Sequence, residues 1–161
     1  YLMGERTPHL DPNARGVFFG LSAKHEKPHM LRAVMEGVVF SLRDCLEVIK
    51  EMGIEINEVR ASGGGGRSKL WRKMQADILG TDIYTINSSE GPAFGVALLA
   101  GVGAGIYNNV KEACASTIEL KTKQSMDAGL YPKYNEYYKI YRNLYDSLKG
   151  NFADMASIWA K

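Results

Sequence analysis

The sequence predicts a layered α/β domain, and three observations support this fold class. Apolar runs of strand length alternate with longer segments whose apolar residues recur at helical spacing. Four consecutive glycines lie directly between one such strand and the helix that follows it. The 161 residues are 45% apolar and 24% charged, which is typical of a globular domain large enough to bury a core. Such alternation predicts a sheet flanked by helices.

The first third of the chain predicts a loop, a strand and a long helix. Residues 4–16 are rich in proline, glycine and charge, and we expect them to form an ordered loop. Residues 17–21 have the length and apolar character of a strand. Pro28 suits the first turn of a helix, where its missing N–H costs nothing, and Gly53 ends that helix.

The middle of the chain predicts two further strands, over residues 58–62 and 82–86. Between them a helix follows the glycines, and Gly80 stops it. The apolar face of this helix consists of Leu70, Trp71, Met74, Ile78 and Leu79. Ser88 and Ser89 are both suited to cap the next helix.

The remaining segments predict three helices, over residues 90–106, 110–117 and 132–156. The first of these carries a stripe of small residues at a spacing of four, made of Ala93, Ala97, Gly101 and Gly105. Each glycine costs a helix about 1 kcal/mol relative to alanine. Close packing against another backbone is the compensating gain that we expect.

Composition excludes several classes of protein. The net charge of +2 is not gathered in a basic tract, so no nucleic acid is expected as a partner. No apolar run reaches the roughly 18 residues needed to cross a membrane. Cys45 and Cys114 lie in helical patterns without a second cysteine or histidine nearby, which indicates a reduced, metal-free cytoplasmic protein. The chain begins at Tyr1 without an initiator methionine, and we expect a fragment.

The glycine run is the strongest chemical signal in the sequence. Glycine allows positive φ angles and lets a backbone lie close to a ligand, and we expect residues 63–68 to form a loop of this kind. The helix that follows presents free N–H groups that favour anions. The P-loop motif and the Rossmann motif both fail at Ser68, where each requires glycine. A tight turn without a ligand is the alternative, but such a turn needs only one or two glycines.

Two stretches resemble the C-terminal domain of FGGY carbohydrate kinases. One is Gly16–Leu21 followed by His29–Glu36, which is similar to a family signature that leads from a strand into a long helix. The other is Ala61–Trp71 with Gln75–Gly80, which resembles the adenosine motif of actin and hexokinase relatives. Residues 4–16 resemble the xylulokinase branch in particular.

The resemblance implies one ribonuclease H-like domain of the actin and hexokinase type, over residues 1–161. It also implies ATP and Mg²⁺ in a cleft between this domain and an N-terminal one. The N-terminal domain, with the sugar site, the first phosphate loop and the aspartate base, has no counterpart here. The resemblance therefore places no catalytic residue and no metal ligand in this chain. The sugar would be bound mainly by the missing domain. The resemblance leaves open whether the chain forms a homodimer.

The resemblance assigns nucleotide contacts to five residues. The backbone of Gly63, Gly64 and Gly65 would approach adenosine and the α-phosphate. Ser68 would offer its hydroxyl to the base or the ribose, and Arg67 would either stack on adenine or point to solvent. The resemblance favours D-xylulose as the sugar that receives the γ-phosphate of ATP, with glycerol, ribulose and gluconate as alternatives. A free-standing nucleotide-binding or interaction module is the alternative from another class.

Other polar and aromatic residues have structural explanations that we prefer. We expect an ion pair between Glu5 and Arg6, an exposed helical pair between Arg32 and Glu36, and capping or exposure for His25 and His29. Asp77 is expected to be structural. Tyrosines on one face of the last helix predict core packing or an interface, and they are Tyr134, Tyr137, Tyr138, Tyr141 and Tyr145.

Overall fold

The computed structural model describes residues 1–88 and 90–159, and the chain forms two compact units. The first unit comprises Tyr1–Ile56, Asp77–Gly80 and Asp127–Lys161. The second comprises Asn57–Ala76 and Thr81–Met126. Each unit has buried apolar side chains of its own, including Val39 and Phe40 in the first and Met74 and Ile83 in the second.

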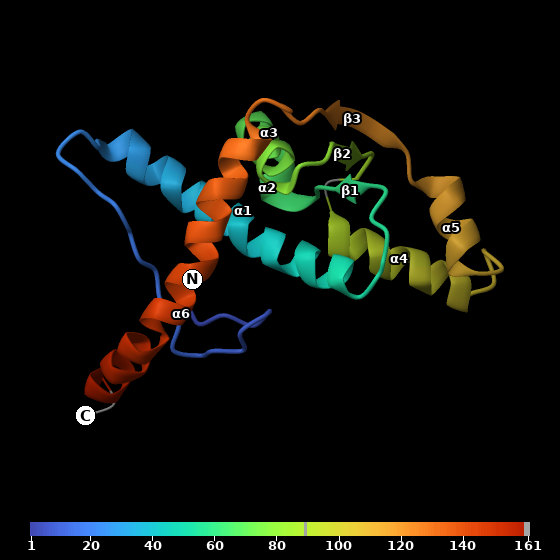
Figure 1. Ribbon diagram of the computed structural model, residues 1–161. Coiled ribbons are helices and arrows are strands. Elements are labelled where there is room, and N and C mark those ends of the chain that lie inside the picture. The colour runs from blue at the N-terminus through green and yellow to red at the C-terminus, as the bar shows by residue number, and fades with distance from the viewer. Residues whose placement is uncertain (89, 160–161) are drawn as a thin grey trace. The chain divides into compact units, whose positions relative to one another are not determined.

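Helices and strands alternate along the chain largely as predicted (Figure 1). In order, they are α1 (Lys27–Glu51), β1 (Val59–Arg60), α2 (Gly63–Arg67), α3 (Lys69–Leu79), β2 (Ile83–Ile86), α4 (Gly91–Gly103), α5 (Val110–Thr117), β3 (Leu120–Gln124) and α6 (Tyr131–Trp159). No helix within residues 1–88 and 90–159 combines the length and hydropathy that crossing a bilayer requires.

The sheet lies in the second unit and has the order β1-β2-β3. β1 runs parallel to β2, with Val59 beside Ile83, and β3 runs antiparallel to β2. The sequence did not predict β3, because its side chains are almost all exposed and show no apolar alternation. Lysines are typical of an edge strand, since they hinder pairing with another chain. Lys123 of β3 forms an ion pair with Asp82 at 2.7 Å.

The strand predicted over residues 17–21 is wrong. The segment has no strand partner among the residues that the structure describes. Its large apolar side chains are exposed, and Phe19 retains 69% of its accessible surface. A strand needs a neighbour for its backbone hydrogen bonds, so apolar composition alone does not make one.

The ends of α1 follow from its sequence, as predicted. Pro28 lies in the first turn, and Gly53 follows the last turn with a φ of 78°. The Glu26 backbone N–H donates to Nδ1 of His29 at 3.1 Å, which confirms a capping role for this histidine. His25 accepts a hydrogen bond from the Ser22 backbone N–H at 2.9 Å.

The tyrosines of α6 pack against α1, which α6 crosses in Figure 1. Tyr134 and Tyr138 are buried, and both lie close to the ring of Phe40. The Tyr134 hydroxyl donates to Glu36 at 2.9 Å and accepts from Arg32 at 3.0 Å. The predicted ion pair between Arg32 and Glu36 is present at 2.8 Å and is tied to α6. Core packing is thus confirmed for these two tyrosines.

The other predictions for the first unit have mixed outcomes. Tyr137 is half exposed and lies outside the packed face, whereas Tyr145 donates to Asp11 at 3.1 Å. The predicted ion pair between Glu5 and Arg6 is wrong, because the Glu5 carboxylate instead accepts from backbone N–H groups of residues 7 and 9 and orders its own loop. Asp77 is buried and accepts from the Asp127 backbone N–H at 2.8 Å, which agrees with a structural role.

The small-residue stripe of α4 gives close packing at one position. A side chain on Gly101 would lie 2.9 Å from the ring of Tyr107, so glycine is needed there. Ala93, Ala97 and Gly105 are exposed, and the prediction of close packing is wrong for them within the described part of the chain.

The ends of α5 agree with the prediction, and Asn109 caps this helix by accepting a hydrogen bond from the Glu112 backbone N–H.

Asp44 is the fully buried carboxylate of α1. It accepts hydrogen bonds from Tyr138 at 2.7 Å and from Tyr1 at 3.3 Å, and Arg142 lies 3.7 Å away. Burial raises the pKa of Asp44 above its ordinary value, although the hydroxyls and Arg142 oppose the change. Burial also raises the pKa of Tyr138, to about 12.

The raised pKa of Asp44 predicts how the unfolding free energy of the chain depends on pH. A carboxyl group whose pKa is higher in the folded than in the unfolded state stabilises the folded state while it is protonated. This stabilisation is complete at pH values below the unfolded-state pKa, and it is lost as pH rises through the folded-state pKa. We expect the unfolding free energy of the native chain, minus that of Asp44→Asn, to fall between pH 4 and pH 8. Urea unfolding of both proteins across this range measures the difference. A difference that grows with pH would show that the hydrogen bonds and Arg142 outweigh burial.

Candidate functional site

Two strand ends define the candidate site in the second unit. β1 and β2 are parallel, so they end at the same edge of the sheet. Residues 61–68 follow β1, and residues 87–91 follow β2. In open α/β sheets, ligands bind outside the carboxyl ends of parallel strands, because the chain there turns into helices whose N–H groups are free.

The glycine segment forms the short helix α2, which corrects the loop predicted from sequence. Gly63 begins it with a φ of 67°, and Ser62 precedes it in an extended conformation. Four glycines are poor helix formers, so the turn needs outside support. Arg72 provides it, because its Nη1 donates to the carbonyl oxygens of Gly66 at 2.5 Å and Arg67 at 3.0 Å.

The four glycines have different surroundings. A Cβ on Gly66 would lie 2.8 Å from the carbonyl oxygen of Ala61, so only glycine allows the turn to lie against the end of β1. A Cβ on Gly65 would meet the ring of Trp71 at 3.3 Å. A Cβ on Gly63 or Gly64 would meet nothing within 4 Å. Packing therefore explains Gly66, whereas the space beside Gly63 and Gly64 is open for another molecule.

The segment after β2 reaches the glycine turn. Ser62 lies against Gly91, where an added Cβ would be 2.9 Å from the serine Oγ. The predicted cap by Ser88 is not formed, because Glu90 occupies the N-cap position of α4. The Ser88 Oγ instead accepts from the Glu90 backbone N–H at 3.2 Å. Ser89, the other predicted cap, lies outside the described residues.

The two polar residues predicted for the site differ in their surroundings. Ser68 directly precedes α3, and its Oγ accepts from the Trp71 backbone N–H at 3.2 Å. Its hydroxyl proton takes no part in that bond. Arg67 is well exposed, and its Nη2 lies 4.0 Å from the Glu90 carboxylate, so an exposed ion pair links the two segments.

Sequence reasoning missed the residues of α3 that support the turn. Arg72 holds its carbonyl groups, and Trp71 and Gln75 lie beside Gly65. The Trp71 Nε1 is buried and has no hydrogen-bond partner among the described residues. The available signal was the helical spacing of Arg72 and Gln75, four and seven residues after Ser68, which places both on the face of α3 beside the turn.

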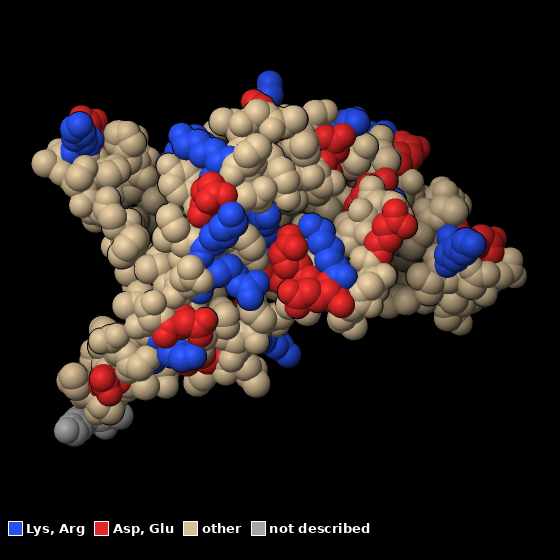
Figure 2. Space-filling view, in the orientation of Figure 1, with Lys and Arg blue, Asp and Glu red and all other residues tan. Residues whose placement is uncertain are grey.

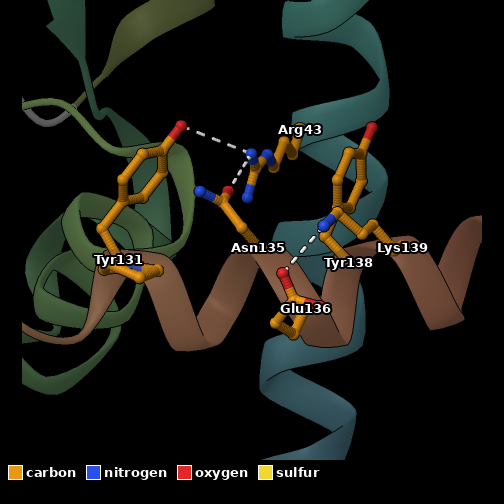
Figure 3. Close-up of a pocket in the computed structure, with 7 residues that line it drawn as sticks. Arg43, Tyr131, Asn135, Glu136, Tyr138 and Lys139 are labelled. Carbon is orange, nitrogen blue, oxygen red and sulfur yellow. Dashed lines mark hydrogen bonds and ion pairs between the residues drawn. The ribbon is translucent and has the colours of Figure 1, made fainter.

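A pocket of about 400 Å³ lies in the first unit, far along the chain from the glycine turn (Figure 3). Its buried Arg43 donates to the Ile78 carbonyl at 3.0 Å and to Asn135 at 2.5 Å, and stacks on Tyr138 at 4.2 Å. Tyr131 fits nearby because Gly80 has no side chain. A Cβ on Gly80 would clash with the Tyr131 ring. These groups hold protein segments together, so the pocket is structural.

Charges and metal-binding groups are dispersed. On the face in Figure 2, acidic and basic side chains lie in small mixed groups. No group of three His, Cys, Asp or Glu side chains in the described residues is arranged to hold a metal ion.

The family model of the FGGY carbohydrate kinases, C-terminal domain, matches residues 1–104, which is more than half of the chain. The chain belongs to the FGGY family of carbohydrate kinases. The fold predicted from the resemblance is confirmed, because the structures similar to this FGGY chain are sugar kinases with the fold of actin and hexokinase.

Known proteins resemble the FGGY chain over nearly its full length. A xylulose kinase of Staphylococcus epidermidis is 35% identical over 158 residues, which are 98% of this chain and 32% of that protein. The ligand-bound xylulose kinase of Lactobacillus acidophilus superposes with a TM-score of 0.87 at 27% identity, over 96% of this chain and 31% of that one. The chain thus spans about a third of these relatives.

A third relative was solved with a nucleotide. Plasmodium falciparum glycerol kinase with ADP superposes with a TM-score of 0.71 at 25% identity, over 91% of this chain and 29% of that one. A solved structure similar to this chain thus contains an adenine nucleotide.

Gly64 and Gly66 make opposite predictions for stability. Gly66→Ala places a methyl group against backbone, and we expect a loss of about 1–3 kcal/mol in the unfolding free energy. Gly64→Ala places the same group in open space within a helical turn, and we expect no loss or a gain of about 0.4–1 kcal/mol. Urea unfolding of both variants measures this. Equal losses would contradict the assignment of Gly66 to packing and Gly64 to open space.

Proposed function

We propose that this chain forms the adenosine-binding part of an ATP-dependent carbohydrate kinase, which transfers the γ-phosphate of ATP to a sugar hydroxyl. The observation that carries the proposal is the open backbone of Gly63 and Gly64 at the shared carboxyl edge of β1 and β2. Membership of the FGGY family supports it. We also propose a cytoplasmic location for the intact enzyme, because Cys45 and Cys114 are free thiols.

The residues around the turn bind and orient the nucleotide in this proposal. Gly63, Gly64 and Gly65 carry no Cβ, so their backbone approaches adenosine and the α-phosphate closely. The Ser68 Oγ already accepts one hydrogen bond, and its proton is donated to the base or the ribose. Arg67 covers the exposed side, since its contact with Glu90 is at the limit of an ion pair and exchanges readily for a ligand.

The remaining chemistry belongs to other parts of the kinase. When bound, ATP supplies the phosphoryl group, and transfer depends mainly on positioning and on stabilising charge. A general base takes the proton of the sugar hydroxyl. The chain has no Asp-x-Gly-Thr phosphate motif. We therefore assign the base, the first phosphate loop and the metal contacts to the other two-thirds of the kinase, and no catalytic residue to this chain.

D-xylulose is the sugar that we propose, with D-xylulose 5-phosphate as the product. The similarity to xylulose kinases over 98% of the chain supports this choice. Glycerol, ribulose and gluconate are the alternatives, and glycerol kinases are also among the relatives. The sugar contacts lie mainly outside this chain, so a comparison of these four substrates with the intact kinase decides among them.

The 161-residue chain should bind adenine nucleotides without catalysis. We expect ATP, ADP and AMP to bind with similar strength, because the groups that we assign here contact only adenosine and the α-phosphate. Without a closed cleft, the dissociation constant should be about millimolar, or about −4 kcal/mol. NMR titration with these nucleotides and GTP measures it, together with an assay of D-xylulose phosphorylation.

Four results would contradict this assignment. A strong preference for ATP over ADP would show that the γ-phosphate is bound here. Shifts that leave residues 63–68 unchanged would place the nucleotide elsewhere, and absence of any binding would favour an interaction module. Turnover by the chain alone would end the claim that the base lies outside it.

Gly64→Val tests the site in the intact kinase. The open space at Gly64 accepts a side chain without a protein clash, so we expect the KM for ATP to rise at least tenfold and the KM for the sugar to change little. Steady-state kinetics with each substrate varied measures both. Gly103→Val is the matched control, because Gly103 is also helical and open but lies at the far end of α4. Equal effects on both KM values would place Gly64 away from the nucleotide.

A further inference from the structure

Helix α1 carries apolar residues on two faces, and the described residues cover only one of them. Val39 and Phe40 are buried, together with Arg43 and Asp44 of the same side. On the opposite side, five large apolar residues follow one another at intervals of three, four or seven. They form the α1 stripe, which consists of Leu31, Val34, Val38, Leu42 and Ile49. Helices that are apolar on both sides are normally buried on both.

The α1 stripe is large for a surface that faces water. Its members are between 38% and 58% exposed, and none of them is charged. Single exposed apolar residues are common, but a continuous apolar row along a helix marks a contact with another surface.

The segment directly before α1 has the same character. Val17, Phe18, Phe19 and Leu21 are 45% to 69% exposed, and no described strand pairs with them. Their backbone is free to join a sheet, and their side chains have the apolar character of a buried strand. Two neighbouring stretches of sequence thus both lack a cover.

We propose that the α1 stripe and residues 17–21 are the docking surface for the remainder of the kinase polypeptide. The chain spans 32% of a relative such as the S. epidermidis enzyme, so about two-thirds of such a protein has no counterpart in this structure. A strand of that remainder pairs with residues 17–21, and an apolar layer of it covers the stripe. The proposal rests on membership of the kinase family and not on the nucleotide site.

A pair of double variants tests the docking surface. Leu31→Gln with Leu42→Gln makes the stripe polar, whereas Leu31→Met with Leu42→Met keeps it apolar at nearly the same volume and helix propensity. Each pair is introduced into the intact kinase and into the 161-residue chain. We expect the Gln pair to lower the urea midpoint of the kinase and to leave that of the chain unchanged. The Met pair should change neither.

Three results would overturn the proposal. If the Gln pair leaves the kinase unchanged, the remainder of the polypeptide does not cover the stripe. If it lowers the midpoint of the 161-residue chain equally, the chain covers the stripe itself. If light scattering shows a dimer of the chain that the Gln pair dissociates, a second copy is the occupant. Since the readout is stability, a failure to bind ATP would count against the proposed function and leave this result standing.

Discussion

The contact between Gly66 and the end of β1 is the constraint on which the candidate site depends. The Gly66 backbone lies so close to the Ala61 carbonyl that a single methyl group would not fit. This contact brings the glycine turn directly behind the strand end, and Arg72 then holds the carbonyl groups of the turn. Gly63 and Gly64 are left at the open side as a consequence. The turn is therefore rigid on its protein side and accessible on the other.

The first unit is organised around charges rather than around an apolar core alone. Arg43 and Asp44 are neighbours on α1, and both are buried against α6. Burying a charge is costly unless hydrogen bonds satisfy it. The tyrosines of α6 supply those bonds and also bury their rings, which explains why so many tyrosines occur on one helix. One face of helix α1 thus combines apolar packing with a polar, highly specific contact, and the other face carries the α1 stripe.

The sequence by itself determined most of the element order and most helix ends, and it indicated where the candidate site lies. Pro28, Gly53 and Gly80 mark helix ends through backbone geometry, which is a local property. The run of glycines between a strand and a helix indicated the candidate site, because no local structure requires four of them. The family also followed from sequence, since its motifs are contiguous stretches. The ion pair of Arg32 with Glu36 was predictable for the same reason, as its partners are one helical turn apart.

Only the tertiary structure decided which of these residues serve packing and which remain open. The four glycines are identical in sequence, and their difference arises from Ala61 and Trp71, which fold against two of them. β3 was not predicted, because an exposed edge strand does not require an apolar pattern in its sequence. Residues 17–21 have that pattern but no strand partner among the described residues. A strand is completed by hydrogen bonds to a neighbour distant in sequence, so its formation is a property of the fold and not of the segment.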